Sequence, residues 1–281
     1  MVAIPTGLTS LLAFVDGPRA AMVEYVVGGL RLSGEDRETA AQLLADTAMK
    51  VACGDSSVLD RWRSRRDGGP AELGNSLRTV ETYVGIAFGH PDRPPNDDHL
   101  QGHVAELMWN LVIEERTTSR DGRRLIRAHG AKADPLEPGG DGLVIYLDSN
   151  DVLVFRLWEI KKHDAQQKVS GTINRAGKQL ASRGHEYLAK LAGPETIAQT
   201  GDLGDLYASM VDLWFDRSER AGVGVSIGTS DHHAPSSHRS FGSLNRLFPE
   251  FSRAQTEAIV VAMPDFPVFA NRVKEIVWSG L

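Results

Sequence analysis

The chain has 281 residues, of which 31 are basic and 37 acidic, so its formal net charge is −6. No apolar run approaches the roughly 20 residues of a membrane-spanning helix, and we therefore expect no membrane partner. The single cysteine, Cys53, excludes an intrachain disulfide and cysteine-rich zinc or iron–sulfur sites. The apolar first residues have neither a basic segment nor a cleavage site, so we expect no secretory signal and predict a reducing cytoplasm.

The negative charge is unevenly distributed along the chain. Residues 116–190 carry 14 Lys and Arg against 9 Asp and Glu, a local charge of +5, which leaves −11 for the remainder. A net charge of −6 taken alone argues against a nucleic-acid partner. The basic middle removes that objection and indicates where a polyanion would bind.

The first third of the chain is predicted to be helical. Apolar residues recur at helical spacing over 38–51 and 71–88. The paired prolines within Gly89–Asn96 cannot continue a helix, so we place a domain boundary there. This predicts a helical N-terminal region over 1–92 and a second domain over 93–281.

The second domain alternates between helical and extended patterns. Two runs rich in β-branched and aromatic residues surround a polar turn at Asp148–Asp151, which predicts a β-hairpin. The order of elements predicts an α/β fold with a mixed β-sheet flanked by helices. The expected elements are a helix from about 100 to 115, strands over 143–147 and 152–161, a helix over 165–191, strands over 222–227 and 258–263, and a helix over 271–278.

The hairpin carries the residues with chemical potential. Alternation along its second strand places Glu159 and Lys161 on an otherwise apolar face, where a charge must be paired, bind a metal or line a cleft. Asp141, flanked by glycines, enters the first strand at a position expected to lie across from about Arg156 to Trp158. A modest stagger would bring its carboxylate beside that of Glu159.

Two adjacent carboxylates repel each other unless a cation bridges them, and oxygen ligands suit Mg²⁺ or Mn²⁺. We therefore predict a metal site formed by Asp141, Glu159 and the backbone carbonyl of Ile160. Lys161 would position or deprotonate the attacking water. Such a set of groups is suited to phosphodiester hydrolysis.

Asp141, followed after 17 intervening residues by Glu159-Ile160-Lys161, resembles the D…(E/D)-x-K signature of the PD-(D/E)XK, or restriction-endonuclease-like, nuclease superfamily. The resemblance implies a restriction-endonuclease-like core and DNA as the substrate. It also implies a further acidic residue on the preceding helix, a position that Glu106 matches, so Glu106 joins the predicted catalytic and metal-binding set. Pro138 is separated from Asp141 by two glycines instead of being adjacent, a position that varies in the family.

The chain combines a Gly-Asp-Gly hairpin and a Glu-x-Lys strand with a late strand that ends near Met263-Pro264-Asp265, and this layout is similar to that of the nuclease subunit of Hachiman-type bacterial anti-phage systems. This similarity implies a role in antiviral defence and a partner helicase or ATPase. The alternative function is that of a catalytically inactive nuclease-fold protein that serves as a nucleic-acid-binding or assembly module. The complete Asp, Glu and Lys set argues against this alternative.

Basic residues on both sides of the hairpin are predicted to contact the nucleic-acid backbone, because phosphate contacts supply affinity without sequence information. For any one of them, the alternative is an ordinary solvated charged face. Gln179 on the following helix resembles a glutamine that some superfamily members place near the site. The predicted nucleic-acid contacts are Arg123, Arg124, Arg127, Lys162, Lys168, Arg175, Lys178 and Gln179.

Two further motifs point to other chemistry. Gly224–Gly228 fits the G-x-S-x-G elbow of serine hydrolases, but that elbow needs a following helix and well-separated acid and histidine partners. The loop over 229–237 does not supply them, so we expect no serine hydrolase. A histidine-rich cluster lacks regular zinc-ligand spacing. We interpret it as a polar connection or a loop near the nucleic acid; its members are Asp231, His232, His233 and His238.

Overall fold

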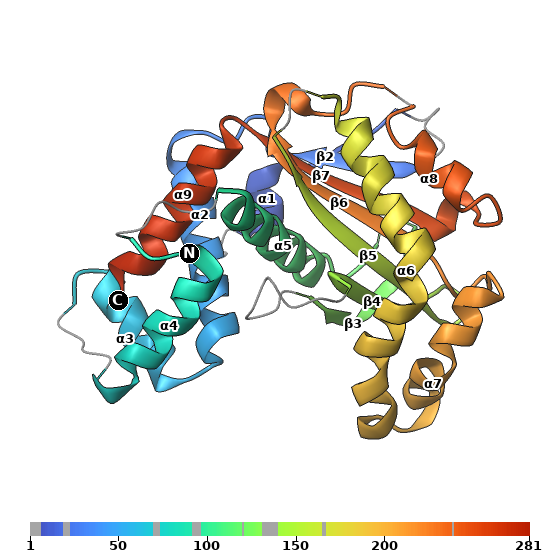
Figure 1. Cartoon of the computed structure of the whole chain (residues 1–281), viewed down its shortest axis with the longest axis horizontal. Helices are drawn as coiled ribbons and strands as arrows, with labels where there is room; N and C mark the ends of the chain where they lie inside the picture. Colours follow the sequence, from blue (N-terminus) through green and yellow to red (C-terminus); the bar gives the residue numbers. More distant parts are fainter. Residues whose placement is uncertain are drawn as a thin grey trace, which may run out of the picture.

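The computed structural model describes residues 7–18, 23–69, 74–91, 97–119, 121–130, 140–164, 167–237 and 239–281. These residues form a seven-stranded mixed sheet in the order β1-β2-β7-β6-β5-β4-β3, with helices on both faces (Figure 1). The predicted α/β class and the mixed sheet flanked by helices are confirmed. The strands are β1 (Val15–Asp16), β2 (Glu24–Gly28), β3 (Arg124–His129), β4 (Gly142–Leu147), β5 (Leu153–His163), β6 (Val223–Ser230) and β7 (Thr256–Met263).

Four neighbouring strands, β2, β7, β6 and β5, run parallel, whereas β1, β4 and β3 are antiparallel to their neighbours. β6 and β7 are almost wholly buried, as expected for parallel strands covered on both faces. The predicted hairpin is β4 and β5. At its turn the Asp148 carboxylate accepts the backbone N–H groups of Asn150 and Val152, at 2.8 and 2.9 Å.

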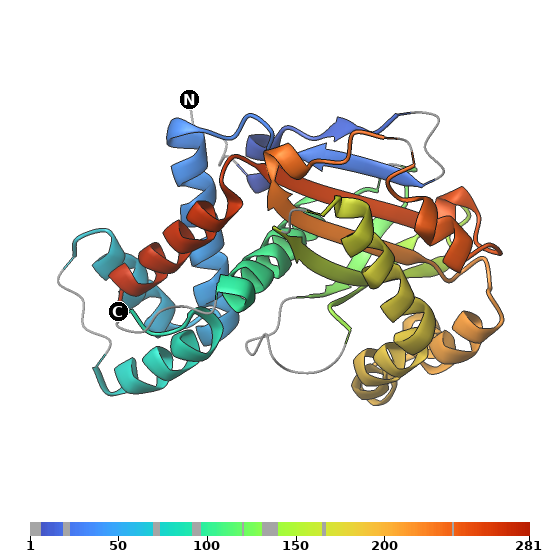
Figure 2. The same ribbon diagram turned by 45° about the horizontal axis from the view of Figure 1, so that its top comes forward.

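The helices separate into two groups, each with its own apolar core. α5 packs on one face of the sheet beside α2 and α9, and α6 covers the other face with α7 and α8 (Figures 1 and 2). Buried residues of β4 and β5 therefore alternate between the two cores. The helices are α1 (Leu8–Leu12), α2 (Gly34–Cys53), α3 (Ser57–Arg66), α4 (Leu77–Phe88), α5 (Asp97–Glu115), α6 (Val169–Ala198), α7 (Gly201–Phe215), α8 (Gly242–Leu247) and α9 (Phe266–Ser279).

The N-terminal region is not entirely helical, and that part of the prediction is wrong. β1 and β2 form one edge of the sheet, and Glu24 of β2 pairs with Glu257 of β7. The helices of this region also pack on the C-terminal helix: Arg272 of α9 donates to Glu38 of α2 at 2.7 Å. The predicted boundary between residues 92 and 93 lies outside the described residues.

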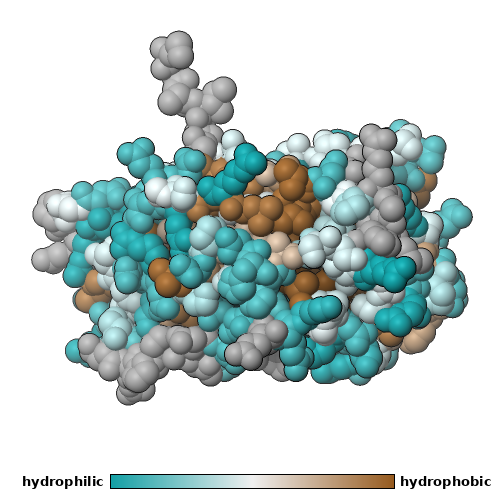
Figure 3. All heavy atoms as spheres, turned by 90° about the horizontal axis from the view of Figure 1, so that it is seen from above, coloured by the Kyte–Doolittle hydropathy of each residue, from teal (hydrophilic) through white to brown (hydrophobic). Residues whose placement is uncertain are grey.

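None of the helices in the described part of the chain is long and apolar enough to span a bilayer. Hydrophilic residues cover most of the face seen from above in Figure 3, with a hydrophobic patch near its middle. Exposed apolar residues such as Val15 and Leu30 are common on protein surfaces and need no special explanation.

Candidate active site

The β4–β5 ladder brings Asp141 and Glu159 face to face. Gly142 pairs with Trp158, so the residue just before Gly142 lies opposite the residue just after Trp158. The expected position of Asp141, across from Arg156 to Trp158 with a stagger, is therefore wrong. Five residues, 148–152, lie between the paired Leu147 and Leu153, one more than the predicted four-residue turn, and in this register no stagger is needed.

Hydrogen bonds and charge hold Asp141 in this position. The backbone N–H of Ile160 donates to Oδ2 of Asp141 at 2.7 Å. The Nζ atom of Lys161 lies 3.8 Å from the same oxygen and forms an ion pair with Oε1 of Glu159. The three predicted catalytic residues of the hairpin therefore meet at its open end, on the face covered by α6.

The glycines beside Asp141 allow two helices to approach the strand closely. A Cβ on Gly142 would lie 2.1 Å from the ring of Trp109 on α5, and one on Gly140 would lie 2.9 Å from Cβ of Tyr187 on α6. The segment that leads into β4 is therefore packed between α5 and α6, which lie on opposite faces of the sheet. Pro138 and Gly139 lie outside the described residues.

Glu159 is an acidic residue in the protein interior, with a side chain that is 0% exposed. Burial, followed by the negative charge of Asp141, raises the pKa of Glu159 to about 8. Its charge partner is Lys161, and neither of its oxygens accepts a well-aligned hydrogen bond from the described residues. A buried carboxylate with a strongly raised pKa is a feature typical of functional sites.

Lys161 is the cation of the site. Burial opposes its charge, but the carboxylates of Asp141, Glu159 and Glu106 outweigh burial and raise the pKa of the ammonium group. Lys161 is therefore protonated at neutral pH.

Glu106 lies near this cluster on α5, the helix on the other face of the sheet. Its helix packs closely on β6, where a Cβ on Gly228 would lie 2.9 Å from Cβ of Ala105. The charge of Glu106 contributes to the raised pKa of Lys161. Among the described residues, however, no group of three or more His, Cys, Asp or Glu is arranged to hold a metal ion. The two opposed carboxylates of the hairpin are thus the main acidic pair.

Three of the predicted nucleic-acid contacts are engaged within the protein. Arg123 is 7% exposed, donates to Asp121 at 2.7 Å and lies over the ring of Tyr146. Its expected phosphate contact is therefore corrected to an interior packing role. Arg127 forms an ion pair of 2.5 Å with Glu195. The third residue, Lys162, forms ion pairs with carboxylates of the α5 start and of the segment after β5, namely Asp98 and Asp164.

The other predicted contacts are at the surface. Arg124 is exposed on the edge strand β3, and Lys168, Arg175 and Lys178 are exposed along α6. Gln179 donates from Nε2 to the hydroxyl group of Tyr187 at 2.8 Å, and Tyr187 packs against Gly140, the residue before Asp141.

Tyr187 is a residue of this site that the sequence did not single out. Its spacing of eight residues from Gln179, about two helical turns, is the one sequence signal for their contact.

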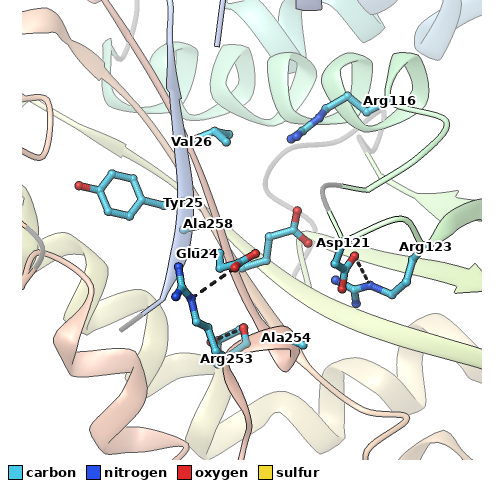
Figure 4. Close-up of a pocket in the computed structure, with 11 residues that line it drawn as sticks. Glu24, Tyr25, Val26, Arg116, Asp121, Arg123, Arg253, Ala254 and Ala258 are labelled. Atoms are coloured by element: carbon cyan, nitrogen blue, oxygen red, sulfur yellow. Dashed lines mark hydrogen bonds and ion pairs between the residues drawn. The ribbon is translucent and has the colours of Figure 1, made fainter. Parts of the chain in front are cut away.

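Arg123 belongs to a second polar centre, at the amino ends of the parallel strands (Figure 4). Two ion pairs lie within it: Arg253 is 3.3 Å from Glu24, and Arg123 is bonded to Asp121. Burial raises the pKa of Glu257 in the same centre. The two ion pairs account for four of the charged groups, whereas Oε2 of Glu257 accepts no well-aligned hydrogen bond from the described residues.

The serine-hydrolase motif has a packing explanation. Gly224–Gly228 lies wholly within β6, and Ser226 is 2% exposed in the middle of the sheet. A Cβ on Gly224 would lie 2.1 Å from the ring of Trp158. The glycine is needed for this contact, so the expectation that the motif is no nucleophile elbow is confirmed.

Comparison with known proteins adds no assignment. No family model matches the chain, and no curated protein matches it significantly.

Proposed function

We propose that this protein is a metal-dependent nuclease that hydrolyses phosphodiester bonds of DNA. One observation carries the proposal: Asp141 and Glu159 oppose each other across the antiparallel β4–β5 pair, with Lys161 close to both carboxylates. Burial and the negative charge of Asp141 raise the pKa of Glu159 to about 8, so ionisation of both carboxyl groups beside one ammonium group leaves an excess negative charge that a cation would offset.

The donor atoms fit Mg²⁺ or Mn²⁺. Asp141 and Glu159 would hold the ion through their carboxylates and Ile160 through its carbonyl, and oxygen-only ligands are the ones these ions prefer. Support comes from Glu159, whose buried oxygens accept no well-aligned hydrogen bond from the described residues. When bound, the ion would lower the pKa of water and stabilise negative charge on a phosphate.

The residues of the chain have separable parts in the proposed reaction. Ile160 keeps Asp141 oriented through its N–H, and the opposed strands fix the distance between the two carboxylates. Lys161 carries three N–H donors and a positive charge, which suit it to hold a water molecule or a phosphate oxygen once the ammonium group leaves Glu159. Glu106 adds negative charge near Lys161 and helps to keep it protonated.

The exposed cations along α6 and on β3 support a polyanionic substrate, since such residues bind phosphates independently of sequence. The choice of DNA, the restriction-endonuclease-like core, the antiviral role and the helicase or ATPase partner come from the resemblance to the PD-(D/E)XK superfamily and stay predictions. A role as an inactive binding module is the competing outcome of the test below.

The test is a cleavage assay with plasmid and single-stranded DNA in Mg²⁺, Mn²⁺ or EDTA. Wild-type protein is expected to cut only with metal, and Asp141→Asn and Lys161→Ala should reduce the rate by about 10²-fold or more. Lys50→Ala, on the distant helix α2, serves as the matched control and should cut normally. Absence of cutting by the wild type, even with a candidate helicase present, would favour the inactive binding module.

A further inference from the structure

A second basic site lies beyond the carboxylates, where α6 begins and β6 ends. Both segments lie at the same end of the sheet (Figures 1 and 2). The hollow between them is lined by cationic, imidazole and hydroxyl groups, and none of the described residues that line it is acidic. The principal lining side chains are Lys168, Ser170, His232, His233, Ser237 and Arg239.

The start of α6 favours a negative charge in this hollow. The helix is 30 residues long, its first turn contains no acidic residue, and its cap residue Lys168 makes no capping side-chain hydrogen bond. The N–H groups at a helix start carry a partial positive charge and bind phosphate and sulfate in many proteins. Lys168 and Arg239 add two full positive charges from different elements.

A buried histidine behind the hollow provides a separate observation. His163 is 2% exposed, and although its Nδ1 atom lies 2.9 Å from Oγ1 of Thr172, its Nε2 atom has no well-aligned hydrogen bond to the described residues. Its ring lies 4.9 Å from that of His233, which in turn lies 4.0 Å from that of His232. Three imidazoles therefore lead from β5 to the wall of the hollow.

This row connects the hollow to the candidate active site. His163 follows Lys161 by two residues on the same face of β5, a separation of about 7 Å along the strand. A nucleic-acid strand that lies across Lys161 would therefore bring one of its other phosphates to the hollow.

We propose that the hollow formed by Lys168, Ser170, His233 and Arg239 is a phosphate-binding subsite for the nucleic-acid strand that enters the carboxylate site. This inference rests on the proposed nuclease function. The phosphate is either a strand end or an internal backbone group a few nucleotides from the bond that is cut. Lys168 and Arg239 act together on one phosphate, with the N–H groups of the α6 start as further donors.

The test measures binding in EDTA, so that no cleavage occurs, by fluorescence anisotropy of a labelled single-stranded oligonucleotide. The double variant Lys168→Gln/Arg239→Gln is expected to weaken binding about tenfold. Because one phosphate contact is lost, the slope of log K against log salt should fall by about one. Unchanged affinity would overturn the proposal, and so would a slope change of about two, which indicates two separate backbone contacts.

Two further variants control for folding and for net charge. Ser170→Asp places a carboxylate at the α6 start, where it should stabilise the helix but repel a phosphate. It should therefore bind as weakly as the double variant while melting no lower than the wild type. Lys50→Gln/Arg61→Gln removes the same charge from exposed positions on α2 and α3 and should bind normally.

The oligonucleotide ends distinguish the two sources of the phosphate. If a 5′- or 3′-phosphate strengthens binding to the wild type but not to the double variant, the hollow holds a strand end. If all oligonucleotides lose affinity equally, it holds an internal phosphate. Loss of binding in these variants together with no Mg²⁺-dependent cutting by the wild type would leave the subsite in place and reject the nuclease. Normal Mg²⁺-dependent cutting by the wild type together with unchanged binding by the variants would support the nuclease and reject the subsite.

Discussion

The backbone N–H of Ile160 donates a hydrogen bond of 2.7 Å to the Asp141 carboxylate. A side-chain oxygen of Asp141 thus accepts the bond that a backbone carbonyl would accept in a regular β ladder. Asp141 therefore serves the fold as well as the proposed chemistry. A loss of activity on mutation of Asp141 must be separated from a loss of structure, and the choice of replacement residue makes this separation possible.

Asp141→Asn keeps an oxygen acceptor for the Ile160 N–H, whereas Asp141→Ala leaves that N–H without its partner. We expect Asp141→Ala to lower the free energy of unfolding by about 1–3 kcal/mol, and Asp141→Asn to lower it much less. Both variants should lose DNA cleavage, because neither has a second carboxylate to oppose Glu159. Urea unfolding curves of the two variants check the first expectation, and equal destabilisation would contradict it.

The stability of the protein should fall with rising pH because of Glu159. Its pKa is raised from 4.5 to about 8, so the folded protein holds this proton more tightly than the unfolded chain does. The resulting stabilisation is complete below pH 4.5 and is lost as the pH rises through about 8. Lys161 titrates above this window. Glu159→Gln lacks the titrating group, so it should gain stability relative to the wild type between about pH 5 and pH 9, measured by denaturant unfolding.

The affinity for Mg²⁺ should depend on whether Glu159 is protonated. Mg²⁺ and the proton compete for Glu159, so the affinity of the wild type for Mg²⁺ should rise by up to about tenfold per pH unit until about pH 8 and then level off. Calorimetry in buffers of different ionisation enthalpy measures both the affinity and the released proton. Lys161→Met removes the competing ammonium group and should bind Mg²⁺ more tightly. A pH-independent affinity in the wild type would contradict this account.

The hairpin and the faces of its residues were predictable because the information is local. Alternation over consecutive residues placed Glu159 and Lys161 together, and the short polar turn identified the partner strand. The register of Asp141 was predicted less exactly, since it depends on how many residues the turn uses. A difference of one residue in the length of the turn changes which residues lie opposite each other along the whole β4–β5 ladder, and so changes the partner of Asp141.

The remaining features depend on contacts between distant parts of the chain. β2 is a short run that becomes a strand by pairing with β7 near the other end of the sequence. Arg123 and Arg124 are adjacent and equally basic in the sequence, yet one is buried over Tyr146 and the other is exposed. The meeting of Arg239 with Lys168 in one hollow likewise follows from the topology, because nothing near either residue in the sequence indicates the other.

Gly142 should be the most sensitive glycine of the site, because a Cβ there would lie 2.1 Å from the ring of Trp109. Gly142→Ala must displace α5 or the strand that carries Asp141, and overpacking of this kind costs about 1–3 kcal/mol. Gly102 lies on the same helix, and a Cβ there would meet nothing within 4 Å beyond its chain neighbours and its own helix backbone. Gly102→Ala should therefore stabilise the protein by about 0.5–1 kcal/mol. Thermal melting of both variants checks the pair, and a Gly142→Ala protein as stable as the wild type would show that α5 does not clamp the site.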